Sequence, residues 1–359
     1  MKQTDAHKKN KEFYRGRRVF VTGHTGFKGA WLTAMLHELG AEATGYALDP
    51  AEGCLFEKMG GDTMLHSVTG DVRYYEKLRS AMQEAQPEVV LHLAAQVPAK
   101  DCFEHPHYTY ETNIMGTVNL FEAIRQCPSV KSVVVVTTDK VYENKGDGAV
   151  YAETDPLGGD DPYSSSKTCT EYVAHAYKKA YLQTENRMVG ISTVRASNVL
   201  GGGDHVPSRL IPSILNAIAA RKPVELRNPQ QTRPWQSVLD ALNGYLSVGR
   251  LMVQNPKKYS SQWNIGPTID GIRDVLWVFD KMRSYYAATD YVVGPTLDVR
   301  ESQTLGLDIS KAMRALGWGP LLSCDKMIYN VVDFFKQQQA GVPEAEICAD
   351  QIRAFFKID

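Results

Sequence analysis

Residues 18–29, RVFVTGHTGFKG, join a short apolar run to a cluster of glycines. The run is rich in β-branched residues and stops at a glycine, which is typical of a buried parallel strand. Gly23, Gly26 and Gly29 follow, and a helical pattern comes next. Glycines in such a turn let a pyrophosphate approach the backbone, where the positive end of the helix can bind it. The stretch therefore predicts a dinucleotide-binding fold, with a plain glycine turn as the simpler alternative.

The pattern of this first unit continues along the chain. Strand-like runs alternate with helical spacing, and this alternation predicts a doubly wound parallel sheet with helices on both faces, a Rossmann fold. The expected strands are 18–22, 42–48, 88–94, 132–138 and 189–194, and the expected helices include 30–39, 74–85, 112–126 and 164–182.

Beyond about residue 200 the pattern changes, because glycine and proline become frequent and the strand-like pieces are short. We expect a smaller α/β region that covers the carboxyl edge of the sheet and binds substrate. The expected division is a cofactor-binding Rossmann domain at 1–198, a mainly substrate-binding region at 199–345 with some return to the sheet, and a C-terminal tail at 346–359.

The composition excludes several classes of protein. The 359 residues include 40 Lys and Arg and 41 Asp and Glu, so the formal charge is −1 and no basic excess supports a broad nucleic-acid surface. No apolar run is long enough to span a membrane, and the basic N-terminus has no secretory apolar segment. The six cysteines are scattered without metal-ligand spacing. We therefore expect reduced thiols, no metal site and a cytoplasmic location.

Two aspartates lie at expected ends of strands in the first half of the sheet. Asp49 stands 26 residues after Gly23, near the position from which an acidic side chain binds the ribose of NAD and repels the phosphate of NADP. A turn aspartate before Pro50 is the simpler alternative. Asp71 could accept a hydrogen bond from the adenine amino group or cap the helix at 74–85.

A second motif, PYSSSK, carries Tyr163 and Lys167. The spacing of four puts both side chains on one face of a helix, where a lysine can stabilise a phenolate so that the tyrosine acts as a base. A surface pair on a helix is the simpler alternative. Polar residues directly follow the expected strand at 132–136, at the edge where the cofactor crevice should lie: Thr137, Thr138, Asp139 and Lys140.

Taken together, these motifs resemble the extended short-chain dehydrogenases/reductases, and within them the nucleotide-sugar 4,6-dehydratases. The resemblance covers about residues 16–340 and is strongest to the branch that acts on CDP-glucose. Its motifs are TGHTGFKG, HLAAQ at 92–96, TNIMGT at 112–117, TTDK at 137–140, YSSSK at 163–167, GGGD at 201–204, RLIP at 209–212, RNPQQTRPWQSVL at 227–239, WNIGP at 263–267 and LDISKAMRALGW at 307–318.

The resemblance implies NAD as the cofactor. Its contacts would come from the glycine turn, the adenine side and the ends of the following strands. The implied residues are Gly23, Thr25, Gly26, Phe27, Lys28, Gly29, Asp49, Asp71, Val72, Leu93, Ala94, Ala95, Thr137, Tyr163 and Lys167.

The resemblance also implies the chemistry. Tyr163 would take the proton of the sugar 4-hydroxyl while hydride leaves C4, Thr138 would bind that hydroxyl, and Lys167 would bind the nicotinamide ribose and lower the pKa of the tyrosine. Asp139 would protonate the departing 6-hydroxyl, and hydride would return to C6. Lys140 stands where thymidine-sugar relatives have a glutamate; it is either the base that removes the C5 proton or a fixed cation that stabilises the enolate.

Substrate contacts are implied for Gln96, Asn198, Arg209 and Arg233, the arginines as clamps for the diphosphate. The helices at 112–126 and 164–182 would pair with those of a second chain in a homodimer. Two other functions remain open: a nucleotide-sugar 4-epimerase or 4-dehydrogenase on the same fold, and, more remotely, a dinucleotide-binding module without catalysis.

Overall fold

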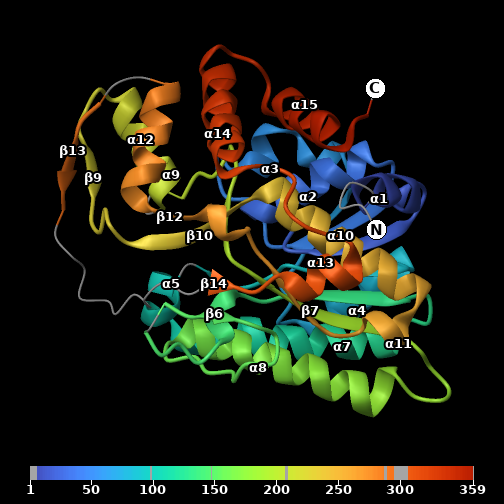
Figure 1. The fold of residues 1–359 in the computed structure, drawn as a ribbon. Helices are drawn as coiled ribbons and strands as arrows, with labels where there is room; N and C mark the ends of the chain where they lie inside the picture. The colour runs from blue at the N-terminus through green and yellow to red at the C-terminus, as the bar shows by residue number, and fades with distance from the viewer. Residues whose placement is uncertain are drawn as a thin grey trace.

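A seven-stranded parallel sheet forms the centre of the molecule (Figure 1). The computed structural model describes residues 6–97, 99–146, 148–206, 209–286, 289–294 and 306–358. The strand order is β11-β7-β5-β4-β1-β2-β3. The strands are β1 (Arg18–Thr22), β2 (Glu42–Ala47), β3 (His66–Thr69), β4 (Val89–His92), β5 (Ser132–Val136), β7 (Gly190–Ala196) and β11 (Gln262–Ile265). The doubly wound parallel sheet predicted from the sequence is confirmed.

The alternation of side chains along the central strands explains why both faces of this sheet are covered. Val134 and Val136 of β5 face one apolar cluster, whereas Val133 and Val135 face another. Successive residues of a strand point to opposite faces, so a continuous valine run serves two layers at once. Helices therefore pack on each side of the sheet.

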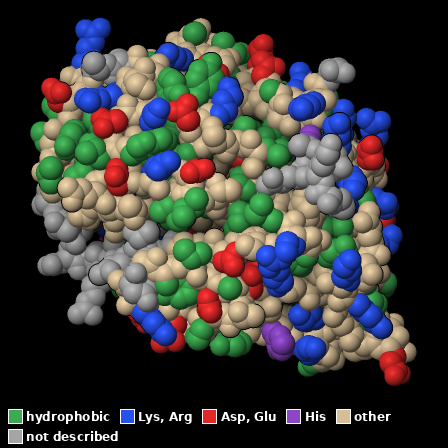
Figure 2. Space-filling model, in the orientation of Figure 1, with side chains coloured by type: hydrophobic (Ala, Val, Ile, Leu, Met, Phe, Trp, Pro, Cys, Tyr) green, Lys and Arg blue, Asp and Glu red, His purple; other side chains and the backbone are tan. Residues whose placement is uncertain are grey.

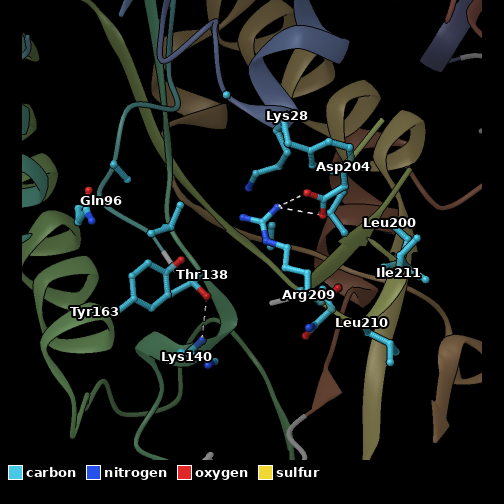
Figure 3. Close-up of a pocket in the computed structure, with 18 of the residues that line it drawn as sticks. Lys28, Gln96, Thr138, Lys140, Tyr163, Leu200, Asp204, Arg209, Leu210 and Ile211 are labelled. Carbon is cyan, nitrogen blue, oxygen red and sulfur yellow. Dashed lines mark hydrogen bonds and ion pairs between the residues drawn. The ribbon is translucent and has the colours of Figure 1, made fainter. Parts of the chain in front are cut away.

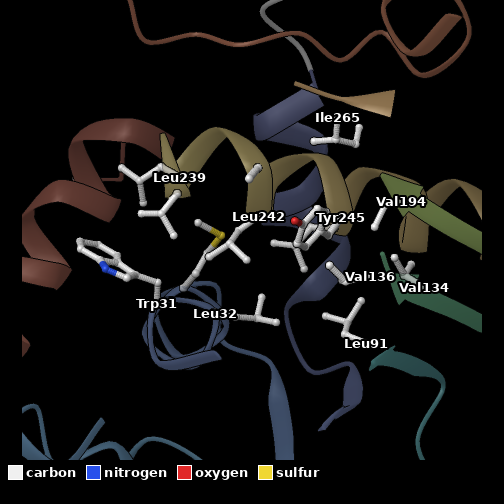
Figure 4. Packing of buried hydrophobic residues seen from close by; sticks show 14 of the residues in the cluster. Trp31, Leu32, Leu91, Val134, Val136, Val194, Leu239, Leu242, Tyr245 and Ile265 are labelled. Carbon is white, nitrogen blue, oxygen red and sulfur yellow. The ribbon is translucent and has the colours of Figure 1, made fainter. Parts of the chain in front are cut away.

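One layer consists of α1 (Ala6–Tyr14), α2 (Phe27–Glu38), α10 (Val238–Gln254) and α15 (Glu344–Phe356), and the other of α4 (Tyr75–Ala85), α7 (Gly116–Arg125) and α8 (Pro162–Tyr177). In the first layer, α10 lies between Trp31 of α2 and the strand residues Leu91 and Val194 (Figure 4). Nearly every side chain of α10 is buried, so this helix is a core element.

A smaller lobe lies beside the sheet, at the upper left of Figure 1. It has its own apolar cluster, to which Ile214, Phe279 and Val331 contribute. Its elements are β8 (Asn198–Leu200), α9 (Leu210–Ala219), β9 (Val224–Leu226), β10 (Thr232–Ser237), β12 (Ile272–Asp274), α12 (Val275–Tyr285), β13 (Tyr291–Val293) and α14 (Cys324–Gln339). β12, β10 and β8 form one small sheet, and β13 pairs with β9.

The remaining elements connect these layers. Two of them, η3 and η5, are π-helical turns; η3 forms the start of the helix expected at 112–126, and η5 forms the end of the helix expected at 164–182. The connecting elements are α3 (Leu55–Lys58), η2 (Gly61–Thr63), α5 (Ala99–Glu104), α6 (Pro106–Tyr110), η3 (Glu111–Met115), η4 (Asp139–Val141), β6 (Val150–Tyr151), η5 (Lys178–Leu182), α11 (Pro256–Tyr259), η6 (Ile269–Gly271), β14 (Gly306–Leu307) and α13 (Ser310–Leu316).

The C-terminal segment is mostly helical. The chain returns to the sheet through α10 and β11, and the division at 1–198, 199–345 and 346–359 stays a prediction. Residues 346–358 of the expected tail belong mostly to α15, which packs on α2 and buries Ile347, Ile352 and Phe356. Burial of these side chains removes a large apolar area from water and holds the helix in place. Of the three expected regions, residues 1–5, 98, 147, 207–208, 287–288, 295–305 and 359 lie outside the described residues.

Candidate active site

A cavity of about 1470 Å³ lies between the carboxyl ends of the central strands and the smaller lobe. Gly23 follows β1, Leu93 follows β4 and Thr137 follows β5, and all three line the cavity. Strand order reverses at β1 and β4, and open α/β sheets bind ligands at such a switch point. The smaller lobe closes the cavity from the other side with Asn198 and Arg209.

The glycine turn has a shape that would admit an anion. Gly23 has a φ of +77°, and a Cβ there would lie 2.7 Å from the Ala94 nitrogen. A Cβ on Gly29 would collide with the Gly23 carbonyl, so both glycines are required by close packing. Gly26 precedes α2 and offers no side chain that could cap the helix. The first N–H groups of a 12-residue helix therefore face the cavity edge, which fits the pyrophosphate of NAD.

The two aspartates expected near the adenosine half of NAD lie in different positions relative to the cavity. Asp71 lines the cavity, and Arg73 binds its carboxylate through Nε and Nη2 at 2.9 and 2.7 Å. The residue before α4 is Tyr74, so Asp71 does not cap that helix with its side chain. Asp49 is exposed, accepts a hydrogen bond from Thr69 at 2.8 Å and is not among the residues that line the cavity.

The end of β5 brings the TTDK residues to the cavity. Thr138 donates to Asp139 Oδ1 at 3.0 Å and accepts from the Lys140 backbone N–H at 3.4 Å. Asp139 is 6% exposed. Burial raises the pKa of the Asp139 carboxyl, while Lys140, Thr138 and Arg233 oppose the shift. A carboxyl group with a raised pKa can hold a proton and give it to a leaving group.

The helix α8 carries Tyr163 and Lys167 and is anchored at its start. Asp161 accepts hydrogen bonds from the backbone of Tyr163 and Ser164, which is a capping box. Tyr163 lines the cavity beside Thr138 (Figure 3). Lys167 lies behind the cavity wall, where its Nζ donates to the Val136 carbonyl at 2.9 Å.

Burial shifts the pKa values of this pair in opposite directions. Burial raises the pKa of the Tyr163 phenol, and Thr138 opposes this shift. Burial and the charge of Lys28 lower the pKa of Lys167 to about 7. The lysine donates to the Val136 carbonyl, and stabilisation of a Tyr163 phenolate by Lys167 stays a prediction.

Three charged side chains meet at the opposite wall of the cavity (Figure 3). Arg209 Nη1 lies 3.0 Å from both carboxylate oxygens of Asp204. Lys28 from the glycine turn faces this pair, and burial together with the charge of Arg209 lowers its pKa to about 8. Two cations and one carboxylate thus border the space between the glycine turn and the smaller lobe.

The structure brings nearly all the residues suggested by the sequence to one cavity; only Asp49 and Lys167 are not part of its lining. Other lining residues were not among those suggested by the sequence; one of them, Asp204, is paired with Arg209, which was. The missed polar and aromatic residues include Tyr108, Thr112, Ser197, Asp204, Glu225, Arg227, Asn228, Gln230, Gln231 and Trp235. Several belong to the GGGD and RNPQQTRPWQSVL motifs, so their presence in those motifs was the available signal.

The cavity combines a phenol, a buried carboxyl group and several cations. Such a set can move protons at a carbinol carbon and hold a diphosphate. Within the described ranges, no three His, Cys, Asp or Glu side chains come together as a metal site, and no helix is both long and apolar enough to cross a membrane. On the face shown in Figure 2, cationic and anionic side chains are interspersed.

Comparison with known proteins identifies a family model and several relatives. Residues 19–266 match the model of the NAD dependent epimerase/dehydratase family. The chain is 42% identical over 332 residues to a CDP-glucose 4,6-dehydratase of Salmonella typhimurium, covering 91% of this chain and 92% of that protein.

Solved structures share the fold. An epimerase of Methanothermobacter thermautotrophicus aligns with a TM-score of 0.79 at 20% identity, covering 94% of this chain and 97% of that one. A dTDP-glucose 4,6-dehydratase of Bacillus anthracis, solved in complex with NAD, aligns with a TM-score of 0.74 at 23% identity, covering 90% and 98%. These likenesses extend over both the sheet and the smaller lobe.

Proposed function

The chain belongs to the NAD dependent epimerase/dehydratase family, and from this premise we propose that it dehydrates CDP-glucose to the 4-keto-6-deoxy sugar nucleotide. NAD is the cofactor of this family. When bound, NAD supplies an acceptor for the hydride of C4 and a donor that returns it to C6. The observation that carries the proposal is that Tyr163, Thr138 and Asp139 face one cavity beside a turn shaped for a pyrophosphate.

Tyr163 and Thr138 would act on the 4-hydroxyl group. The two side chains lie beside each other at the cavity (Figure 3), so a hydroxyl bound between them would meet a proton acceptor and an orienting group together. Burial raises the pKa of Tyr163, so a nearby cation would favour loss of the phenol's proton. The positive charge of the oxidised nicotinamide and the nearby Lys167 would provide it. Lys167 would at the same time bind the nicotinamide ribose.

Asp139 and Lys140 would carry the elimination. Once C4 is a ketone, the C5 proton is acidic and the 6-hydroxyl can leave as water. Asp139, whose pKa is raised by burial, would protonate the departing oxygen. Lys140 is half-buried at the cavity and would either remove the C5 proton or stabilise the enolate as a cation.

The smaller lobe would hold the nucleotide, so that residues 1–198 serve mainly the cofactor and residues 199–345 mainly the substrate. Arg209, Arg233 and Asn198 line the cavity from this lobe and would contact the diphosphate. Lys28 faces the same space from the first turn of α2 (Figure 3). Gln96 lines the cavity after β4 and would contact the sugar.

Turnover of CDP-glucose tests the proposal. Purified protein with NAD should convert CDP-glucose to a product that is labile in alkali and whose proton NMR spectrum has a new methyl doublet. A hexose that keeps its C6 hydroxyl, with only the C4 configuration changed, would instead identify a 4-epimerase. Absence of turnover with any nucleotide hexose would reject both.

We also propose a homodimer, in which the layer of α7 and α8 meets its copy in a second chain. Exposed apolar side chains on this layer include Met115 at 50% and Tyr172 at 61%. Light scattering at micromolar concentration should report about twice the chain mass of 40.0 kDa, and a monomer would reject the proposal. The six cysteines are unpaired, which supports a reducing compartment such as the cytoplasm.

A further inference from the structure

A buried carboxylate outside the cavity connects α8, which carries Tyr163, to the segment after β5, which carries Thr138 and Asp139. Glu171 lies on α8 four residues after Lys167 and eight after Tyr163, so the three side chains share one face of the helix. Glu171 is 4% exposed and does not line the cavity. A buried carboxylate costs free energy unless it is fully paired, so its partners indicate its role.

The partners of Glu171 come from the end of β5 and from the neighbouring strand β7. Thr137 of the β5 end donates to Oε1 at 2.7 Å, and Thr193 of β7 donates to Oε2 at 2.6 Å. Arg195 of β7 forms a two-pronged pair through Nε and Nη2, each at 3.1 Å. One of these four hydrogen bonds connects α8 to the end of β5, from which Thr138 and Asp139 project, and the other three connect it to β7.

The same network reaches the residues after Asp139. Arg195 Nη1 donates to the Tyr142 hydroxyl at 3.0 Å, and that hydroxyl donates to Asn264 Oδ1 of β11 at 2.6 Å. Tyr142 directly follows η4, which begins at Asp139. The segment that carries Asp139 and Lys140 is therefore held on both sides by bonds that lead back to Glu171.

Glu171 also balances the charge of Lys167. The groups that face this ammonium are Lys28 from α2, Cys102 from α5, His92 from β4 and Glu171 from α8 itself. Lys28 repels the charge, and His92 is neutral because burial lowers its pKa to about 3. Glu171 is the carboxylate that favours the protonated lysine in this group.

We propose that Glu171 is a positioning residue, which ties α8 to the end of β5 and to β7 and so sets Tyr163 and the charged Lys167 against Thr138 and Asp139. The inference rests on the proposed dehydratase function for its kinetic test. It assigns Glu171 no contact with substrate or cofactor.

Glu171→Gln tests this role, because glutamine retains the shape and loses the charge. We expect kcat to fall by about 10- to 100-fold with little change in KM, since a small displacement of reacting groups has effects of this size. Without the carboxylate, Lys167 loses its proton at lower pH, so the alkaline limb of the pH profile should move to lower pH. The dissociation constant of NAD, measured by calorimetry, should rise with pH along the same shifted limb.

A double variant separates positioning from mere structural support. Glu171→Gln alone leaves Arg195 as an unpaired buried charge and lowers the melting temperature. Glu171→Gln/Arg195→Met removes that charge and should recover most of the melting temperature while kcat and the pH profile remain displaced. Recovery of activity together with the melting temperature would overturn the inference, and so would a folded Glu171→Gln with wild-type kcat and pH profile.

The wild-type protein distinguishes this inference from the function on which it rests. If wild type does not turn over CDP-glucose, the proposed function fails, and the NAD titration still tests Glu171. An unshifted NAD titration in both variants then rejects the inference independently. Glu171→Asp, which keeps the charge, should retain the wild-type position of the alkaline limb.

Discussion

Two regions of the site use charged residues in different ways. One is the end of β5 with α8, and the other is the rim of the cavity formed by the smaller lobe. At β5 and α8 the charges are buried and bound by several partners: Glu171 and Arg195 have side chains only 3% exposed. At the rim, Arg209 is 34% exposed and its described carboxylate partner is Asp204. The first region is assembled before any ligand arrives, whereas the second holds a cation that a diphosphate can recruit. Chemistry and recognition should therefore respond to mutation in different kinetic constants.

Tyr163→Phe should give the largest effect, because it removes the proposed base and leaves the ring packing in place. We expect kcat for CDP-glucose to fall by about 10³-fold, within the range of general base catalysis. Binding of NAD should be nearly unchanged by calorimetry. Unaltered turnover would remove the phenol from the mechanism and weaken the distinction between the two regions.

Asp139→Asn should separate the first half of the reaction from the second. Oxidation at C4 does not need the acid, but loss of the 6-hydroxyl does, so product formation should slow by about 10²-fold. In a single turnover the absorbance of reduced nicotinamide should accumulate. If the formation of reduced nicotinamide slows as much as the formation of product, Asp139 serves the first step instead.

Arg209→Ala should affect recognition. Losing a charge-assisted contact to a phosphate costs about 1.5–3 kcal/mol, so KM for CDP-glucose should rise by about 10- to 100-fold with a smaller change in kcat. Asp204→Asn is the matched control, since it frees Arg209 from its carboxylate and should lower KM slightly. An equal increase of KM in both variants would mean that the ion pair itself shapes the site.

The smallest effect concerns the pH dependence of binding at the rim. The pKa of Lys28 is lowered to about 8, so this lysine loses its charge as the pH rises through that value. Affinity for CDP, measured by calorimetry, should therefore fall several-fold between pH 7 and pH 9 beyond the effect of the ligand's own ionisation. Lys28→Arg keeps its charge over this range, so its affinity for CDP should change little between pH 7 and pH 9. If the affinity of this variant still falls steeply, another group is responsible for the pH dependence.

The contrast between the regions also explains what could be predicted from the sequence. The glycine turn, TTDK and the Tyr163–Lys167 pair are local patterns, so the sequence alone revealed them; the three glycines of the turn, TTDK and Tyr163 line one cavity, whereas Lys167 does not. Glu171 was missed because its partners lie 22 to 34 residues away, and only the fold places them beside it. Asp204 was visible in a motif, but its pairing with Arg209 across a loop was not.

Two other differences have physical reasons. α10 buries polar side chains such as Asp240 and Asn243 along with its apolar ones, and a sequence pattern does not reveal such burial, so its return to the sheet could be expected only in general terms. In α15, Cys348, Ile352 and Phe355 do have helical spacing, and this signal was not used when a tail was expected. The raised pKa of Tyr163 depends on burial, which spacing of four residues alone does not reveal.

Transfer of deuterium from C4 tests the central claim most directly. CDP-glucose labelled with deuterium at C4 is incubated with the protein and NAD, and the product is examined by NMR and mass spectrometry. The account predicts that the label appears in the C6 methyl group of the same molecule. Deuterium that stays at C4 without a new methyl group, or that is lost to water, would contradict it.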